Sequence, residues 1–258
     1  MNLEKELKVS IYLSKKAGEE IIKVYNQDFG VEYKEDLSPL TLADKRSNEI
    51  IVEGLKKAFP DYSILSEESQ DEKSRLYNDW CWIVDPLDGT KEFIKKNGEF
   101  TVNIALAYKH RVVLGVIYVP VSGEIYYAVK GQGAHYEKNG KMQAIRVSDA
   151  VKQIRLVCSR SHPSERLQKL IEANKDLISE IIRAGSSIKG CLIAKGEAEV
   201  YYRFGPTMEW DTAAMQCIAE EAGAIFRQMD GSEMLYNRQN CLNEKGFYII
   251  NKKENLLV

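Results

Sequence analysis

The acidic residues that follow one apolar segment have the types and the spacing of a metal site. Residues 82–90 read Trp-Ile-Val-Asp-Pro-Leu-Asp-Gly-Thr, so an apolar run leads directly into two carboxylates, Asp85 and Asp88. A buried carboxylate without a partner costs on the order of a few kcal/mol, so a cation is expected beside this pair. Two oxygen ligands three residues apart on a loop suit a hard cation such as Mg²⁺. The alternative is an Asp-rich turn in which Asp88 or Thr90 caps a helix.

Two further acidic segments lie far from this one in the sequence. Residues 209–224 read Glu-Trp-Asp-Thr-Ala-Ala-Met-Gln-Cys-Ile-Ala-Glu-Glu-Ala-Gly-Ala, and we expect Asp211 or Thr212 to open a helix there. A capping role for Asp211 is the alternative to a ligand role. Upstream, a short apolar stretch leads into Glu67 and Glu68, for which a solvated acidic loop is the alternative.

Together the three segments resemble the inositol monophosphatase superfamily of Mg²⁺-dependent, Li⁺-sensitive phosphatases. The run at 85–90 and the pair Trp210-Asp211 resemble its two signature motifs, and Glu67 stands where the superfamily has a third ligand. A finer resemblance is to its 3'(2'),5'-bisphosphate nucleotidase branch, which removes the 3'-phosphate of 3'-phosphoadenosine 5'-phosphate (PAP). The segments that carry this finer resemblance are 90–93, 97–105, 159–162, 185–189 and 205–211.

The elements that must position these residues alternate between helix and strand. Apolar periodicity predicts helices at 3–25, 41–59, 163–173, 187–195 and 212–222. Strands are predicted at 64–65, 80–84, 100–107, 112–119, 125–129, 155–158 and 199–203. Layered sheets and helices fit this order. The resemblance implies the sharper α+β fold, a layered α-β-α-β-α sandwich like those of inositol monophosphatase and fructose-1,6-bisphosphatase.

We expect two lobes that form one compact catalytic unit. The N-terminal lobe, 1–150, would carry most of the metal ligands. The C-terminal lobe, 151–258, would carry Asp211 and the residues that select the substrate. A chain of 258 residues with 44% hydrophobic and 29% charged residues is long enough to bury a large core in this way.

Composition and charge exclude several other classes of protein. The net charge of −2 gives no reason to expect a nucleic acid polymer or an anionic membrane as partner. The five cysteines are scattered without a C-x-x-C pair, which argues against a zinc site and a disulfide framework. The N-terminus lacks the apolar core of a signal peptide, and no apolar run has the length of a membrane span. We therefore expect a cytoplasmic protein, with a homodimer and peripheral attachment to the inner face of the cell membrane left open.

The resemblance implies a centre of two or three Mg²⁺ ions. A phosphate monoester resists attack because it is anionic, and paired metals both neutralise its oxygens and lower the pKa of a bound water. The implied ligands are the carboxylates of Glu67, Asp85, Asp88 and Asp211 and the backbone carbonyl of Leu87.

The resemblance also implies three catalytic residues, Glu67, Asp44 and Thr90. Thr90 would orient and help to activate the attacking water, and the amides that follow Gly89 would hold phosphate oxygens. Asp44 matches an acidic position near the catalytic water, where it would hold a loosely bound metal or accept a proton. Its alternative is a helix N-terminal acid favoured by the helix dipole.

A bisphosphate substrate needs cations at a distance from the metals. By resemblance His162, Lys189 and Arg203, together with Ser186, would meet the second phosphate or the nucleoside. The alternatives are a solvated helix face for Lys189, a strand-end surface charge for Arg203 and a loop cap for His162. The residues implied at the reacting phosphate are Asp88, Gly89, Thr90 and Asp211.

The leading hypothesis is a Mg²⁺-dependent phosphatase that hydrolyses PAP, a small nucleotide, to AMP and phosphate. Such an enzyme would relieve product inhibition in sulfate assimilation. Two alternatives remain: the same metal chemistry applied to an inositol or sugar phosphate, and a sensor that binds PAP without turnover.

Overall fold

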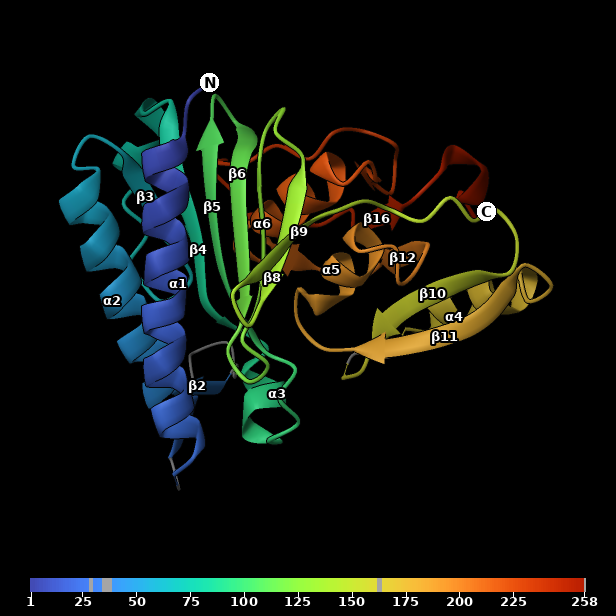
Figure 1. Ribbon diagram of the computed structural model, residues 1–258, viewed down its shortest axis with the longest axis horizontal. Helices are drawn as coiled ribbons and strands as arrows, with labels where there is room; N and C mark the ends of the chain where they lie inside the picture. The colour runs from blue at the N-terminus through green and yellow to red at the C-terminus, as the bar shows by residue number, and fades with distance from the viewer. Residues whose placement is uncertain (28–29, 34–38, 162–163, 258) are drawn as a thin grey trace.

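Five alternating layers of helices and sheets make up the described chain. The computed structural model describes residues 1–27, 30–33, 39–161 and 164–257. In Figure 1 long helices cover one face of a large sheet, further helices separate that sheet from a smaller one, and a helix lies against the other face of the smaller sheet. This arrangement confirms the predicted α-β-α-β-α sandwich.

The first layer consists of α1 (Glu4–Tyr25) and α2 (Leu42–Ala58), close to the predicted helices. The buried face of α1 includes Leu13, Ala17 and Ile21, at the spacing of one helical stripe. A short antiparallel pair, β1 (Val31–Tyr33) and β2 (Pro39–Thr41), leads into α2.

The second layer is a seven-stranded sheet in the order β3-β4-β5-β6-β7-β8-β9. Its strands are β3 (Ser63–Ser66), β4 (Trp80–Asp88), β5 (Thr101–Tyr108), β6 (Arg111–Val119), β7 (Glu124–Val129), β8 (Ala134–Lys138) and β9 (Lys141–Ile145). The first five agree with the predicted strands. The edge pair β8 and β9 was not predicted, because β9 buries only Ile145 and has little apolar signal.

The central strand β4 extends further than predicted. The sequence predicts that the strand ends at Val84 and that a loop follows, but pairing with β5 continues to Asp88. Asp85 lies opposite Asn103 and Asp88 lies opposite Thr101, so β4 has one extra residue between these pairs. Side chains three residues apart in a regular strand point to opposite faces. The bulge therefore turns Asp85 and Asp88 toward the same side of the sheet.

The middle layer holds α5 (Ile188–Ala194) and α6 (Glu209–Glu221). The prediction that Asp211 or Thr212 opens the second of these helices is wrong, since α6 begins at Glu209 and Met208 is its N-cap. The Asp211 carboxylate accepts a hydrogen bond of 2.6 Å from the Met208 amide. Asp211 thus lies in the first turn of α6, with its second oxygen available for other contacts.

The fourth layer is a five-stranded sheet in the order β11-β10-β12-β16-β14. Its strands are β10 (Ile154–Ser159), β11 (Ile178–Ala184), β12 (Val200–Arg203), β14 (Ile225–Gln228) and β16 (Phe247–Ile250). The last layer is α4 (Glu165–Ala173), within the predicted helix 163–173, whose first residue lies outside the described part of the chain. The remaining elements are η1 (Lys73–Tyr77), α3 (Thr90–Ile94), β13 (Thr207–Met208), β15 (Leu242–Asn243) and η2 (Lys253–Asn255).

The chain passes from the large sheet to the smaller one between Ile145 and Ile154. All five cysteines are buried and free. Over the described residues, none of the helices combines the length and the apolar character that a bilayer span requires.

Candidate active site

A cavity lies where the bulge of β4, helix α3 and the first turns of α5 and α6 meet. Its volume is about 260 Å³. The predicted site residues that line it are Glu67, Asp85, Leu87, Asp88, Gly89, Thr90, Ser186, Lys189, Arg203 and Asp211. Asp44 reaches this group through Thr90, whereas His162 lies outside the described residues. The fold therefore brings together residues from both predicted lobes.

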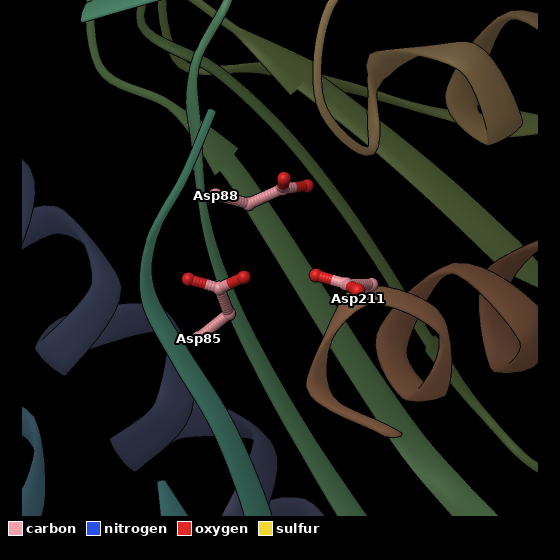
Figure 2. Close-up of side chains that lie close together, drawn as sticks. All are labelled: Asp85, Asp88 and Asp211. Atoms are coloured by element: carbon pink, nitrogen blue, oxygen red, sulfur yellow. The ribbon is translucent and has the colours of Figure 1, made fainter. Parts of the chain in front are cut away.

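Three aspartates converge at the centre of the cavity. Figure 2 shows Asp85 and Asp88 from β4 and Asp211 from α6 directing their carboxylates into one space. Oxygen atoms of all three lie within 4.8 Å of one another. This separation is small enough for one cation, or a closely spaced pair, to contact all three side chains.

Burial makes this cluster unfavourable without a cation. The Asp85 side chain is only 1% exposed, and burial, followed by the nearby Glu67 and Asp88, raises its pKa well above the ordinary value. Burial and the charge of Asp88 likewise raise the pKa of Asp211 to about 8. Like charges in a low-dielectric site disfavour ionisation in this way. A bound metal would favour the ionised form of the same carboxylates.

The hydrogen-bond donors at the three carboxylates are neutral. Asp88 accepts hydrogen bonds from the Ser187 hydroxyl at 2.7 Å and from the Asn103 amide at 3.2 Å. Asp85 accepts one from the Leu87 amide at 3.1 Å. Among the described residues, no lysine or arginine forms an ion pair with any of the three aspartates. A set of hard oxygen donors without a cationic side chain fits a hard divalent metal ion.

The raised pKa values predict how pH affects the metal-free protein. The pKa of Asp211 is raised to about 8 in the folded protein, whereas the pKa of an unfolded Asp is about 4. Between these values the folded state binds more protons than the unfolded state, so the free energy of unfolding falls as pH rises. We expect the melting temperature measured in EDTA to fall from about pH 5 to about pH 8 and saturating Mg²⁺ to reduce this slope. An EDTA melting temperature that rises over the same range would contradict the cluster's electrostatics.

Thr90 and Asp44 form a pair at the edge of the cavity. The Thr90 hydroxyl donates to Asp44 Oδ1 at 3.2 Å. The other oxygen, Oδ2, accepts a hydrogen bond of 2.8 Å from the Thr41 amide and so completes a capping box at the start of α2. Asp44 is thus a helix N-terminal acid and a partner of Thr90 at once, and burial raises its pKa. The two alternatives for Asp44, a helix N-terminal acid and an acid near the catalytic water, are therefore compatible.

One face of α2 holds the segments that carry the acidic residues. Ser47 donates to the Pro86 carbonyl at 2.7 Å, next to Asp85. Asn48 accepts a hydrogen bond from Ser66 at 2.7 Å and donates to the Glu68 carbonyl at 3.4 Å, on either side of Glu67. Sequence reasoning missed both residues, although they follow Asp44 by three and four positions and therefore share its face of the helix.

The turn before α3 depends on Gly89. This residue has φ of 95°, and a Cβ there would lie 3.2 Å from the Glu99 carbonyl and 3.3 Å from the Ser186 side chain. The proposed capping roles of Asp88 and Thr90 are wrong, because Gly89 is the N-cap and Thr90 is the first helical residue. The short helix α3 therefore starts directly after Gly89.

Polar and basic groups line the opposite wall. Lys189 is 7% exposed, its ammonium donates to the Ser186 carbonyl, and the same group lies 5.6 Å from the centre of the Tyr201 ring. Burial lowers the pKa of Lys189. Ser186 Oγ and Arg203 Nε are buried and have no hydrogen-bond partner among the described residues. Buried polar atoms of this kind are normally satisfied, so a ligand is expected to complete them.

An ion pair beside the cavity joins the two predicted lobes. Arg160 donates two hydrogen bonds of 2.7 Å to the Glu99 carboxylate, and the Gly185 amide donates to the same group at 2.8 Å. A Cβ on Gly185 would lie 2.6 Å from the Glu99 carbonyl, so only glycine fits this contact. Three of the segments that resemble the nucleotidase branch, 97–105, 159–162 and 185–189, therefore meet in space.

Comparisons with known proteins agree with the geometry. The sequence profile described as the inositol monophosphatase family matches residues 2–256. The 3'(2'),5'-bisphosphate nucleotidase CysQ of Salmonella typhimurium is 42% identical over 240 residues, which cover 92% of this chain and 96% of that protein. CysQ of Buchnera aphidicola is 43% identical over 242 residues, covering 92% of this chain and 90% of that protein. The crystal structure of CysQ from Bacteroides thetaiotaomicron has a TM-score of 0.85 at 41% identity, over 95% of this chain and 97% of that one.

Proposed function

This chain belongs to the inositol monophosphatase family, and we therefore propose that it is a Mg²⁺-dependent 3'(2'),5'-bisphosphate nucleotidase. It hydrolyses the 3'-phosphate of PAP to give AMP and phosphate. The observation that carries this proposal is the convergence of Asp85, Asp88 and Asp211, within 4.8 Å, in a chain that aligns over most of its length with bisphosphate nucleotidases.

The acidic residues of the cavity hold the metal. Asp85, Asp88 and Asp211 are its main carboxylate ligands, Glu67 approaches from the turn after β3, and Leu87 contributes its backbone carbonyl. These residues hold two or three Mg²⁺ ions, since a single divalent cation does not neutralise four carboxylates. When bound, the ions neutralise the phosphate oxygens and lower the pKa of the attacking water.

Thr90 orients the attacking water. Its hydroxyl proton points to Asp44, so the lone pairs of the same oxygen are available to accept a hydrogen bond from water. Asp44 is placed to accept the proton that passes through this pair. The amides after Gly89 and the carboxylate cluster confine the reacting phosphate to one position, which lowers the entropic cost of the attack.

Lys189, Arg203 and Ser186 bind the second phosphate of the substrate. Lys189 supplies a buried positive charge, and the unpartnered Ser186 Oγ and Arg203 Nε supply hydrogen-bonding groups on the same wall. A phosphate anion can satisfy all three at once because it offers several acceptor oxygens. His162, outside the described residues, is the fourth member of this set.

Phosphate release from a panel of substrates tests the proposed function. The panel is PAP, inositol 1-phosphate and fructose 1,6-bisphosphate, each with Mg²⁺ and each with and without Li⁺. We expect kcat/KM for PAP to be the highest of the three. It should exceed the value for inositol 1-phosphate by about tenfold or more, because one extra charge-assisted contact to a second phosphate contributes about 1.5–3 kcal/mol.

The other outcomes separate the alternatives. A preference for inositol 1-phosphate would retain the metal chemistry and reject the second-phosphate site. A preference for fructose 1,6-bisphosphate, which also has two phosphates, would retain the metal chemistry and reject PAP as the substrate. No turnover of any of the three, with Mg²⁺ present and the protein folded, would reject the enzyme and favour a PAP-binding sensor.

A further inference from the structure

The connection between β3 and β4 carries Glu67 and is called the Glu67 loop below. It also contains a buried arginine, Arg75, which lies in η1 and is 1% exposed. Its guanidinium donates to both oxygens of Asp71, at 2.7 and 3.0 Å. Since arginine is seldom fully buried, a side chain that gives up its hydration needs several strong partners. Asp71 is only one of the partners of this guanidinium.

The same guanidinium reaches the loop before β15. Its Nη1 donates to Asn237 Oδ1 at 2.7 Å and its Nη2 donates to the Arg238 carbonyl at 2.9 Å. The Asn237 amide returns a hydrogen bond of 3.0 Å to the Arg75 carbonyl. Lys73 adds a contact of 3.1 Å to the Gln239 carbonyl. These bonds join the Glu67 loop to the loop before β15.

The loop before β15 also forms hydrogen bonds with the first residue of α6. Glu209 is 0% exposed and accepts hydrogen bonds from the backbone amides of Asn237, at 2.6 Å, and Arg238, at 2.9 Å. The Arg238 side chain adds a contact of 3.1 Å to the same carboxylate. Glu209 is the first residue of α6, and Asp211 lies in the same turn. A continuous set of bonds therefore runs from the Glu67 loop to the Asp211 helix.

None of these side chains lines the active-site cavity. Asp71, Arg75, Asn237 and Glu209 are all outside its wall, so their effect on the reaction has to pass through the segments that they hold. The two segments they join are the ones that bring Glu67 and Asp211 to the cavity from opposite lobes. Contacts behind the ligands set ligand spacing, and their loss typically weakens metal affinity about 10- to 100-fold.

We infer that Arg75 is a positioning residue of the metal centre, which holds the Glu67 loop at the correct distance from Asp211. This inference rests on the proposed function, because it assumes that Glu67 and Asp211 hold the same ions. Its consequence is specific: without the Arg75 bridge the two ligands separate, and the metal binds more weakly while the other residues of the cavity remain in place.

The test compares Arg75→Lys and Arg75→Met with Arg155→Lys. Arg155 pairs with Glu199, which is 1% exposed, and neither residue lines the active-site cavity. The control thus perturbs an arginine that pairs with a buried glutamate elsewhere, although Arg155 itself is 33% exposed. Mn²⁺ affinity is measured by electron paramagnetic resonance without substrate, and the Mg²⁺ dependence of PAP hydrolysis is measured in parallel. Asp71→Asn, at a partly exposed position, tests the same bridge if Arg75→Met does not fold.

We expect the Arg75 variants to bind Mn²⁺ about tenfold or more weakly, with the Mg²⁺ requirement raised by a similar factor and kcat largely recovered at saturating Mg²⁺. Arg155→Lys should lower the melting temperature and leave Mn²⁺ affinity unchanged. Folded Arg75→Lys and Asp71→Asn with wild-type Mn²⁺ affinity would overturn the inference. A wild-type protein that binds no Mn²⁺ would instead overturn the proposed function.

Discussion

Replacement of Asp85 by Asn is expected to abolish phosphate release from PAP. Asp85 is the most buried of the three converging carboxylates, and Asn offers a neutral oxygen in its place. Metal ions contribute several kcal/mol of transition-state charge stabilisation, and a loss of about 4 kcal/mol corresponds to about a thousandfold in rate. Steady-state phosphate release at saturating Mg²⁺ measures the effect.

The melting temperature of the same variant distinguishes the loss of a metal ligand from a failure to fold. Because burial, followed by the nearby Glu67 and Asp88, disfavours a charge on Asp85 and raises its pKa in the metal-free protein, Asp85→Asn should melt at the same or a higher temperature in EDTA. Asp149→Asn, at an exposed position, is the matched control and should leave both turnover and Mg²⁺ binding unchanged. Normal turnover by correctly folded Asp85→Asn would reject the metal assignment.

Replacement of Lys189 by Met is expected to raise KM for a bisphosphate substrate much more than KM for a monophosphate. Met keeps the apolar stem and removes the ammonium of Lys189, a side chain that lines the cavity. A charge-assisted hydrogen bond contributes about 1.5–3 kcal/mol, so KM for PAP should rise about 10- to 100-fold. KM for a 3'-monophosphate such as adenosine 3'-phosphate should change little, because that substrate has no second phosphate.

Lys195→Met is the control for this effect. Lys195 follows the last turn of the same helix, pairs with Glu197 and lies over Tyr136, away from the cavity. Its replacement should leave KM for both substrates unchanged. Equal increases in KM for the bisphosphate and the monophosphate in Lys189→Met would remove the second-phosphate role.

The grouping of Asp85, Asp88 and Asp211 could be predicted from sequence because these residues occur in short motifs that carry their own chemistry. Apolar runs that end in Asp85 and Asp88, and a helix start with Asp211, are visible without a structure. The manner in which they meet was not visible. The bulge in β4 depends on pairing with β5, and the earlier start of α6 depends on a bond between Asp211 and the Met208 amide.

The residues that hold the site were missed for a different reason. Ser47, Asn48, Asn103 and Ser187 are neutral side chains whose partners are remote in sequence, so their roles appear only when the segments come together. The same is true of the bridge from Arg75 to Asn237, which are 162 residues apart. Single charged or polar residues of this type are most often surface residues, which leaves sequence patterns without a signal.

Strands at sheet edges account for some of the remaining differences, whereas β16, an interior strand with four buried residues, was also not predicted. β9 buries only Ile145, and most residues of β11 are partly or fully exposed. An edge strand needs few apolar residues because neighbouring strands and water satisfy its backbone. Its sequence therefore resembles that of a loop.

The most direct test of the central claim is a crystal structure of the protein with PAP and Ca²⁺, which replaces Mg²⁺ and slows turnover. We expect Ca²⁺ between Asp85, Asp88 and Asp211 at about 2.3–2.6 Å from their oxygens, with the 3'-phosphate on the metal and the 5'-phosphate against Lys189 and Arg203. Ca²⁺ bound away from the three aspartates, or PAP bound with its 5'-phosphate on the metal, would contradict the account.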